Sequence, residues 1–135
     1  MSFTQAVSSG LGNYATFSGR ASRSAYWWWV LFTVVVQWVT SFVDAALFGT
    51  FSFVEVDGAI YGGVTSVFTP ITTLVGLALL IPSIAVAVRR FHDLGRSGWW
   101  LLLAFTGIGA IVIFFWFMVR GTHGPNHFGP DPLEL

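Results

Sequence analysis

The amino-acid sequence predicts an all-α integral membrane protein: a three-helix transmembrane bundle with a short N-terminal interfacial helix and a Gly/Pro-rich C-terminal tail. Two properties of the 135-residue chain support this fold class. Hydrophobic residues make up 55 % of the chain and charged residues only 9 %, which is too few to cover a water-exposed surface. The charges are also concentrated between long apolar segments, as at membrane boundaries. We expect one membrane domain over residues 1–135.

The first predicted span covers residues 25–48. It is about 36 Å long at 1.5 Å per residue, enough to cross a bilayer core of about 30 Å. Ser22 is its predicted N-cap, and Asp44, close to the far interface, is expected to be solvated. Gln37 lies near mid-span, where an unpaired amide is costly, so we expect it to pack against another helix or a second copy of the chain.

The segment that precedes this span, residues 1–16, carries apolar side chains at spacings of three and four. This spacing predicts a short helix on the membrane surface, with a frayed N-terminus as the alternative. After the first span, Asp57-Gly58 between two short apolar runs predicts a small hairpin with a type I′ turn.

The second predicted span covers residues 69–90, with Thr69 as N-cap and Pro70 in the first turn. We expect Gly95 to end this helix in a left-handed conformation. The third predicted span covers residues 98–119. Because Gly107-Ile108-Gly109 sits at its middle, a broken or re-entrant hairpin is an alternative to one continuous helix.

The tail, residues 120–135, is rich in turn-forming residues and lacks apolar periodicity, so it is either an ordered loop or a disordered end. With three spans, five arginines fall on one side of the membrane and Arg120 falls on the other with Glu55 and Asp57. The positive-inside rule then places the N-terminus and the 89–97 loop in the cytoplasm and the tail outside. A re-entrant third segment would bring the tail inside as well.

Three different motifs follow one another along the chain: Phe17–Trp28, Arg89–Trp100 and Gly121–Pro132. Together they resemble the bacterial inner-membrane family known as domain of unknown function 805, the YhaH-like and YhaI-like proteins. The resemblance implies a small multi-pass protein of the bacterial cytoplasmic (inner) membrane and brings no established activity. The chain departs from the family pattern at Ala25, where an acidic residue is usual, and at His123 and His127 in the tail.

Polar residues at the span boundaries are the candidate site. We expect one group of them to form either a binding site for an anionic lipid head group or a structural polar cluster: Arg20, Arg23, Arg89, Arg90, His92, Asp93 and Arg96. The tail motif adds a second group: Gly124, Pro125, Asn126, Phe128, Gly129 and Asp131. Arginine suits a phosphate because its planar guanidinium can donate two parallel hydrogen bonds.

The same residues argue against several function classes. His92-Asp93 resembles a general base with its carboxylate, but adjacent helical residues point about 100° apart and no nucleophile accompanies them, so we expect no catalytic residues. His123 and His127 lack a third ligand, so we expect neither a metal nor a cofactor. The net charge of zero argues against a nucleic-acid partner.

We therefore expect a non-enzymatic scaffold or accessory subunit that packs against itself, as a homo-oligomer, or against another membrane protein. The alternative is a protein that binds or carries an anionic lipid or a small anion through the arginine cluster. Under both hypotheses the lipid bilayer is a partner.

Overall fold

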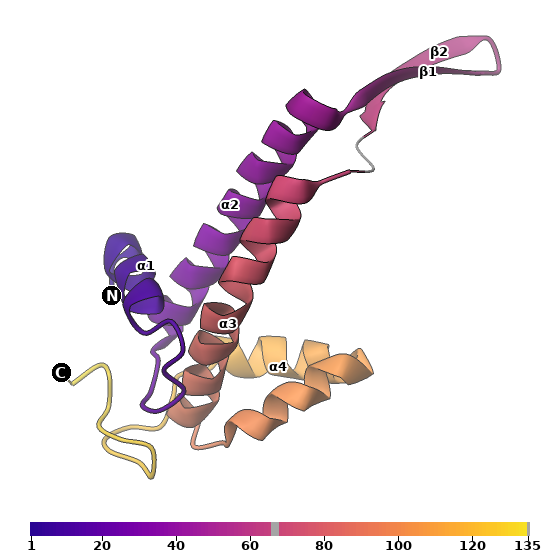
Figure 1. Ribbon diagram of the computed structural model, residues 1–135. Coiled ribbons are helices and arrows are strands. Elements are labelled where there is room, and N and C mark those ends of the chain that lie inside the picture. Colours follow the sequence, from indigo (N-terminus) through magenta and orange to yellow (C-terminus); the bar gives the residue numbers. More distant parts are fainter. Residues whose placement is uncertain (66–67, 135) are drawn as a thin grey trace. The chain divides into compact units, whose positions relative to one another are not determined.

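The computed structural model describes residues 1–65 and 68–134 and is mostly helical. The elements follow in chain order as α1 (Phe3–Gly12), α2 (Arg23–Phe48), β1 (Thr50–Val56), β2 (Ala59–Thr65), α3 (Pro70–Asp93), the 3-10 helix η1 (Gly98–Thr106) and α4 (Ile108–Met118) (Figure 1). The chain folds as two compact units. Met1–Phe32 and Leu80–Leu135 form the first unit, and Thr33–Leu79 forms the second.

Two helices of the described chain, α2 with 26 residues and α3 with 24, are long and apolar enough to cross a membrane. Ser22 caps α2 as predicted, since its hydroxyl accepts a hydrogen bond from the Ala25 amide at 3.2 Å. Pro70 is the first residue of α3, where its missing N–H costs nothing. The helix continues through Pro82.

In the second unit, the start of α3 is capped by a side chain from α2. Asp44 accepts hydrogen bonds from the amides of Ile71 at 3.1 Å and Thr72 at 2.8 Å. These amides have no acceptor within α3, because the first turn of a helix always leaves its N–H groups unpaired. Asp44 has 0 % of its surface exposed, so the prediction that it is solvated was wrong.

Gln37 also lies against α3 in this unit. A Cβ atom at Gly76 would sit 2.8 Å from the Gln37 side-chain nitrogen, so the amide lies directly over Gly76. The amide oxygen of Gln37 is buried and has no hydrogen-bond partner among the described residues. The polar side chain therefore packs within the chain.

The predicted hairpin is present, and it makes the fold less purely helical than expected. β1 and β2 pair antiparallel, with Val56 opposite Ala59. The two turn residues, Asp57 and Gly58, have φ angles of 51° and 79°, as a type I′ turn requires. Every residue of both strands is exposed.

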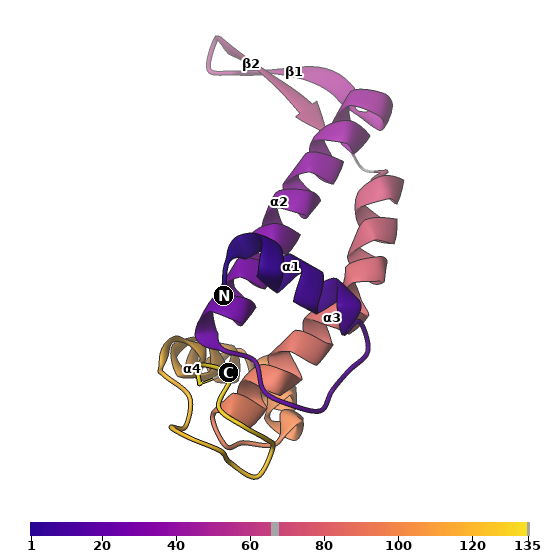
Figure 2. The same cartoon turned by 90° about the vertical axis from the view of Figure 1, so that its left-hand side faces the viewer.

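In the first unit, α1 packs on α2 (Figures 1 and 2). Ser2 and Gln5 form a capping box that fixes the start of α1. A Cβ atom at Gly10 would lie 2.2 Å from the ring of Trp29, so α1 approaches this ring as closely as glycine allows. Trp29 is 1 % exposed and donates a hydrogen bond to the Ser83 hydroxyl at 3.1 Å. The N-terminus is thus an ordered helix.

The third apolar segment is not the single continuous helix predicted over residues 98–119. Gly107, at φ 71° and ψ −65°, separates η1 from α4, and α4 doubles back beside η1 (Figure 1). A Cβ atom at Gly109 would lie 2.0 Å from the Leu103 carbonyl oxygen, so this glycine permits the tight return. The structure has the broken hairpin that the sequence also allowed. Each arm is at most about 18 Å long, too short to cross a core of about 30 Å.

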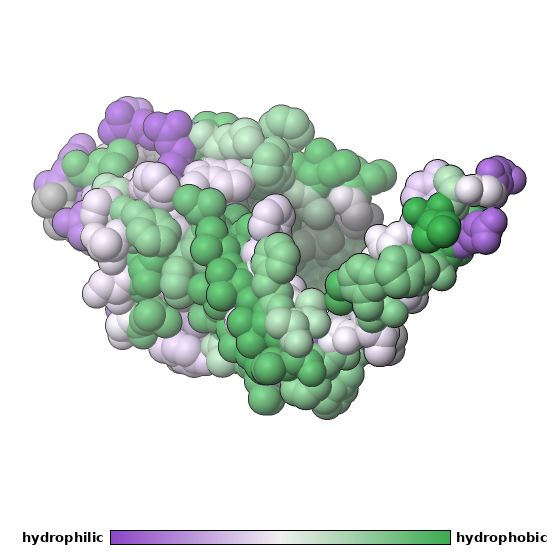
Figure 3. Space-filling view, turned by 90° about the horizontal axis from the view of Figure 1, so that it is seen from above, coloured by the Kyte–Doolittle hydropathy of each residue, from purple (hydrophilic) through white to green (hydrophobic). Residues whose placement is uncertain are grey.

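The core of the first unit is a cluster of side chains from α3 and α4: Ala87, Phe91, Ile113 and Phe117. The Phe117 ring lies 4.7 Å from Phe91 and 4.6 Å from Tyr26. Other large apolar side chains remain exposed, such as Phe105 at 87 %, and hydrophobic residues cover much of the face seen in Figure 3. An apolar exterior of this kind suits a bilayer.

Candidate functional site

The three sequence motifs meet at the C-terminal end of α3. Gly95 follows the helix with φ 70°, and the Arg96 amide donates to the Phe91 carbonyl at 2.9 Å, which ends α3 as predicted. Asp93 is the last residue of α3 and is 3 % exposed. A buried carboxylate needs charged or hydrogen-bonded partners, and two arginines supply them.

Asp93 lies between Arg20 and Arg90. One carboxylate oxygen, Oδ1, accepts from Arg20 Nε at 3.1 Å and lies 3.0 Å from Arg20 Nη2. The other, Oδ2, accepts from Arg90 Nη1. The side chains of Arg20, Arg90 and Asp93 are 1 %, 0 % and 5 % exposed. These three residues form a buried charged cluster that carries one net positive charge, which we call the Asp93 cluster.

Arg20 also holds the tail in place. Its guanidinium donates to the carbonyl oxygens of Thr122 at 2.6 Å, Gly124 at 2.7 Å and Gly129 at 3.2 Å. The Thr122 amide in turn donates to the Asp93 carbonyl at 2.8 Å. The tail is therefore an ordered loop that lies at the same end of the first unit as the joint between α3 and η1.

Arg90 connects the same carboxylate to the end of α4. It donates to the carbonyl oxygens of Phe117, at 3.1 Å, and Val119. These oxygens are among the last carbonyls of α4, which lack partners within that helix. The Nε of Arg90 is buried and has no acceptor among the described residues. One carboxylate thus fixes the ends of α3 and α4 and the position of the tail.

His92 also connects segments that are far apart in the chain. Its Nδ1 lies 3.0 Å from the Gly19 carbonyl oxygen, and its ring stacks on Phe128 with centroids 4.0 Å apart and an interplanar angle of 3°. Asn126 donates to the His92 carbonyl at 2.9 Å. The imidazole therefore joins the first and third motifs.

Within the tail, Asp131 closes the loop. Its carboxylate accepts from the Leu133 amide at 3.0 Å and the Gly124 amide at 3.1 Å. The pKa of Asp131 lies below its usual value, chiefly because of the hydrogen bond from the Leu133 amide. The hydrogen bond from the Gly124 amide and the nearby charges of Arg20 and Arg120 lower it further. Of the other tail residues, Asn126 pairs with Gly129 and accepts from the Phe128 amide, while Pro125 is exposed.

The remaining predicted arginines lie outside the Asp93 cluster. Arg89 is buried and donates to the Ala85 carbonyl of its own helix at 3.3 Å. The guanidinium of Arg96 lies 3.7 Å from the centre of the Trp116 ring, within cation–π range. Arg23 is exposed and donates to the Met118 carbonyl at 3.2 Å. The seven polar residues grouped in the sequence therefore do not form a single open surface.

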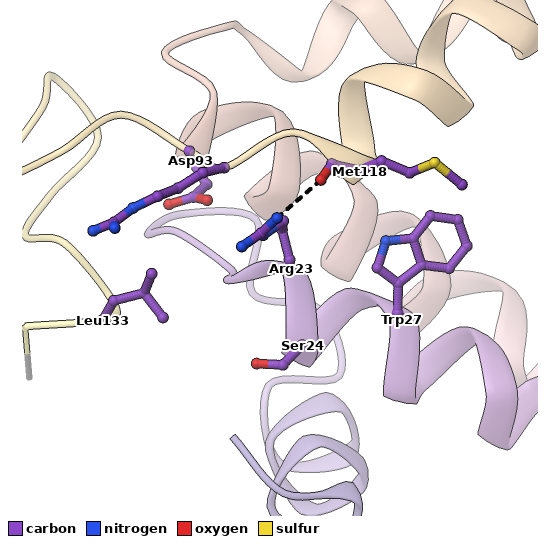
Figure 4. Close-up of a pocket in the computed structure, with 8 residues that line it drawn as sticks. Arg23, Ser24, Trp27, Asp93, Met118 and Leu133 are labelled. Carbon is purple, nitrogen blue, oxygen red and sulfur yellow. Dashed lines mark hydrogen bonds between the residues drawn. The ribbon is translucent and has the colours of Figure 1, made fainter.

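A pocket of about 490 Å³ opens beside the Asp93 cluster. Figure 4 shows Arg23, Ser24 and Trp27 from the first turns of α2 facing Met118 at the end of α4 and Leu133 of the tail. Arg120 also lines the pocket. The sequence alone does not group Arg120 with Arg23, because a three-span topology places the two residues on opposite sides of the membrane.

Asp93 and His92, the two adjacent residues that resemble a catalytic pair in the sequence, are both engaged in contacts within the protein. Among the described residues, no three His, Cys, Asp or Glu side chains are close enough to hold a metal ion. Asp93 is bonded to two arginines through its two oxygens, and His92 is stacked and hydrogen-bonded. Both residues stabilise contacts between segments far apart in the chain.

These features define a small, mostly helical protein with an ordered polar end and two helices long and apolar enough to cross a membrane. The family described as "Protein of unknown function (DUF805)" matches residues 14–130, and the chain belongs to this family. It is 36 % identical over 123 residues to inner membrane protein YhaH of Escherichia coli strain K12, covering 90 % of this chain and 91 % of that protein. It is 35 % identical to inner membrane protein YhaI of the same strain, covering 90 % of each. No solved structure is significantly similar.

The family predicted from the three motifs is thus confirmed. It is a family of unknown function, and its similar members are named inner membrane proteins. They indicate no biochemical activity.

Proposed function

We propose that the protein crosses the inner membrane twice, through α2 and α3, with η1 and α4 forming an apolar hairpin that does not cross. At 1.5 Å per residue, 26 and 24 residues give about 39 and 36 Å, enough for the bilayer core with some tilt. The hydrogen bonds from Arg20 and Asn126 to the tail and to α3 support a tail on the same side as the joint between α3 and η1.

This topology puts all six arginines on one side of the membrane. The acidic hairpin residues Glu55 and Asp57 follow α2 and precede α3, so they fall on the opposite side. Positive-inside bias then favours a cytoplasmic N-terminus, joint and tail. The chain contains no cysteine, so single cysteines can report each side. In intact cells we expect a membrane-impermeant maleimide to label the Glu55→Cys variant and to spare Glu134→Cys. Labelling of both, or of Glu134→Cys alone, would contradict the topology.

We further propose that the protein is a non-enzymatic scaffold or accessory subunit. The observation that carries this proposal is the Asp93 cluster, whose ionisable side chains are buried and paired with each other and with backbone carbonyls. A general acid, base or nucleophile must be free to contact a substrate, whereas these side chains are at most 5 % exposed and are already paired. Their arrangement suits a structural role.

The surface available to a partner is apolar. Phe105 and Ile108, at the bend between η1 and α4, are 87 % and 77 % exposed, whereas Gln37 packs against α3 of the same chain. We therefore propose that the bend, rather than Gln37, contacts another membrane protein or a second copy of the chain.

Native mass spectrometry of the full-length protein, extracted gently from its own membrane, tests this role. We expect a stoichiometric second protein or a second copy, and we expect the Phe105→Gln variant to lose it. Phe42→Gln, at an exposed position of α2, is the matched control and should keep the partner. A bare monomer, or equal behaviour of the two variants, would contradict a scaffold that uses this surface.

A further inference from the structure

The pocket beside the Asp93 cluster has the composition of an anion site. Its volume of about 490 Å³ lies in the range of ordinary ligand pockets. Two arginines, Arg23 and Arg120, line it together with three apolar side chains: Trp27, Met118 and Leu133. In Figure 4, Arg23 lies between Trp27 and Leu133, with its guanidinium directed to the carbonyl of Met118.

Both arginines have hydrogen-bond donors to spare. A guanidinium carries five N–H donors, and Arg23 uses one of them on the Met118 carbonyl at 3.2 Å. The Arg120 side chain is exposed and makes no hydrogen bond or ion pair with the described residues. Two guanidinium groups on one pocket can grip an anion from two directions.

The acids near the pocket do not cancel this charge. Asp93 lines the pocket, but its two oxygens are held by Arg20 and Arg90. The oxygens of Asp131 accept from two tail amides. Glu134, next to the pocket-lining Leu133, adds a third acid. The four arginines, Arg20, Arg23, Arg90 and Arg120, still outnumber the three acids. The pocket therefore has a net positive field, which attracts an anion.

We propose that this pocket binds a phosphate ester, with Arg23 and Arg120 donating hydrogen bonds to the phosphate oxygens. The remainder of the ligand would lie against Trp27, Met118 and Leu133. Arg23 and Trp27 stand at the start of a predicted span, where arginine and tryptophan meet lipid head groups. The phosphate of an anionic phospholipid and that of a soluble glycerol phosphate share the chemistry that the two arginines recognise. This site is independent of the scaffold role, since it needs no protein partner.

The test uses the full-length protein in a neutral detergent with two probes, dihexanoyl phosphatidylglycerol and glycerol 3-phosphate. Arg120→Gln is the informative variant because its side chain makes no hydrogen bond or ion pair with the described residues. Arg96→Gln is the matched control, since it removes the same charge from a residue that packs on Trp116 outside the pocket. Thermal melting of each variant verifies folding.

We expect Arg120→Gln to weaken probe binding about tenfold, the loss expected for one charge-assisted hydrogen bond, and Arg96→Gln to leave binding within about twofold. Arg120→Lys should recover part of the affinity, because lysine keeps the positive charge but cannot donate two parallel hydrogen bonds as a guanidinium does. Tighter binding of phosphatidylglycerol than of glycerol 3-phosphate identifies a lipid as the source of the phosphate, and equal binding identifies a soluble ester. Failure of both probes to bind, or equal weakening by Arg120→Gln and Arg96→Gln, would overturn the proposal.

Discussion

Replacing Asp93 by asparagine tests whether one carboxylate organises the polar end of the protein. The change keeps the size of the side chain and removes its charge. Arg20 and Arg90, with side chains 1 % and 0 % exposed, would then face each other across a neutral amide. Breaking a buried ion pair by removing one partner costs about 3–5 kcal/mol. Because asparagine keeps one oxygen acceptor, we expect a loss of about 3 kcal/mol.

The loss should be largest in the tail, which reaches α3 through Arg20 and the Asp93 carbonyl. Hydrogen exchange of the purified full-length protein in mild detergent should show faster exchange over residues 121–131, since the Thr122 amide donates to Asp93. Denaturant titration in the same detergent measures the loss of overall stability. Asp57→Asn, at the exposed hairpin turn, is the matched control and should change neither measurement.

A double variant sharpens the test. In the Asp93→Asn background, Arg20→Gln should reduce the free energy of unfolding by less than it does in the wild-type protein. The reason is that effects of substitutions at directly interacting residues on stability are not additive. Equal stability of Asp93→Asn and Asp57→Asn, with unchanged tail exchange, would refute the organising role of this carboxylate. Strict additivity of the double variant would refute the direct pairing.

Three further predictions follow from single contacts. Gly121→Ala should destabilise the first unit by about 1–3 kcal/mol in the same titration, because its Cβ would lie 2.0 Å from Asp93 Oδ2, whereas Gly63→Ala has open space and should not. Because the pKa of Asp131 is lowered in the folded protein, its carboxylate stabilises the tail above about pH 4, and this stabilisation is lost as the pH falls through the folded pKa. Hydrogen exchange at the Gly124 amide should therefore become faster, relative to its rate in an unfolded chain, as the pH falls below about 4. Asp131→Asn should abolish this pH dependence. Asp44→Ala should speed exchange at Ile71 and Thr72, and Glu55→Ala, at an exposed strand position, should not.

Local chemistry made several elements predictable from the sequence. Ser22 could be identified as a cap, and Pro70 as a first helical residue, because their effects act within one helical turn. The Asp57-Gly58 turn and the end of α3 at Gly95 were predictable for the same reason, since each depends on a backbone conformation that the residue itself favours. The apolar lengths of α2 and α3 likewise follow from composition along the chain.

The prediction over residues 98–119 shows where local patterns are insufficient. An apolar segment of this length satisfies the test for a span whether or not it is continuous. The choice between a span and a hairpin depends on Gly107 and Gly109, and therefore on how closely α4 can approach the Leu103 carbonyl. Asp44 was wrongly predicted to be solvated for a related reason. Its partners, Ile71 and Thr72, are 27 and 28 residues away.

The family, the two long helices and the hairpin could be predicted because hydrophobicity and turn chemistry depend on neighbouring residues. That residues from the three motifs meet around the buried Asp93 cluster is visible in the folded protein alone. Arg20 is 73 residues from Asp93 and 102 from Thr122, and no periodicity encodes a pairing at that separation. The pairing arises because a buried carboxylate and two buried guanidinium groups stabilise the folded protein only when they meet.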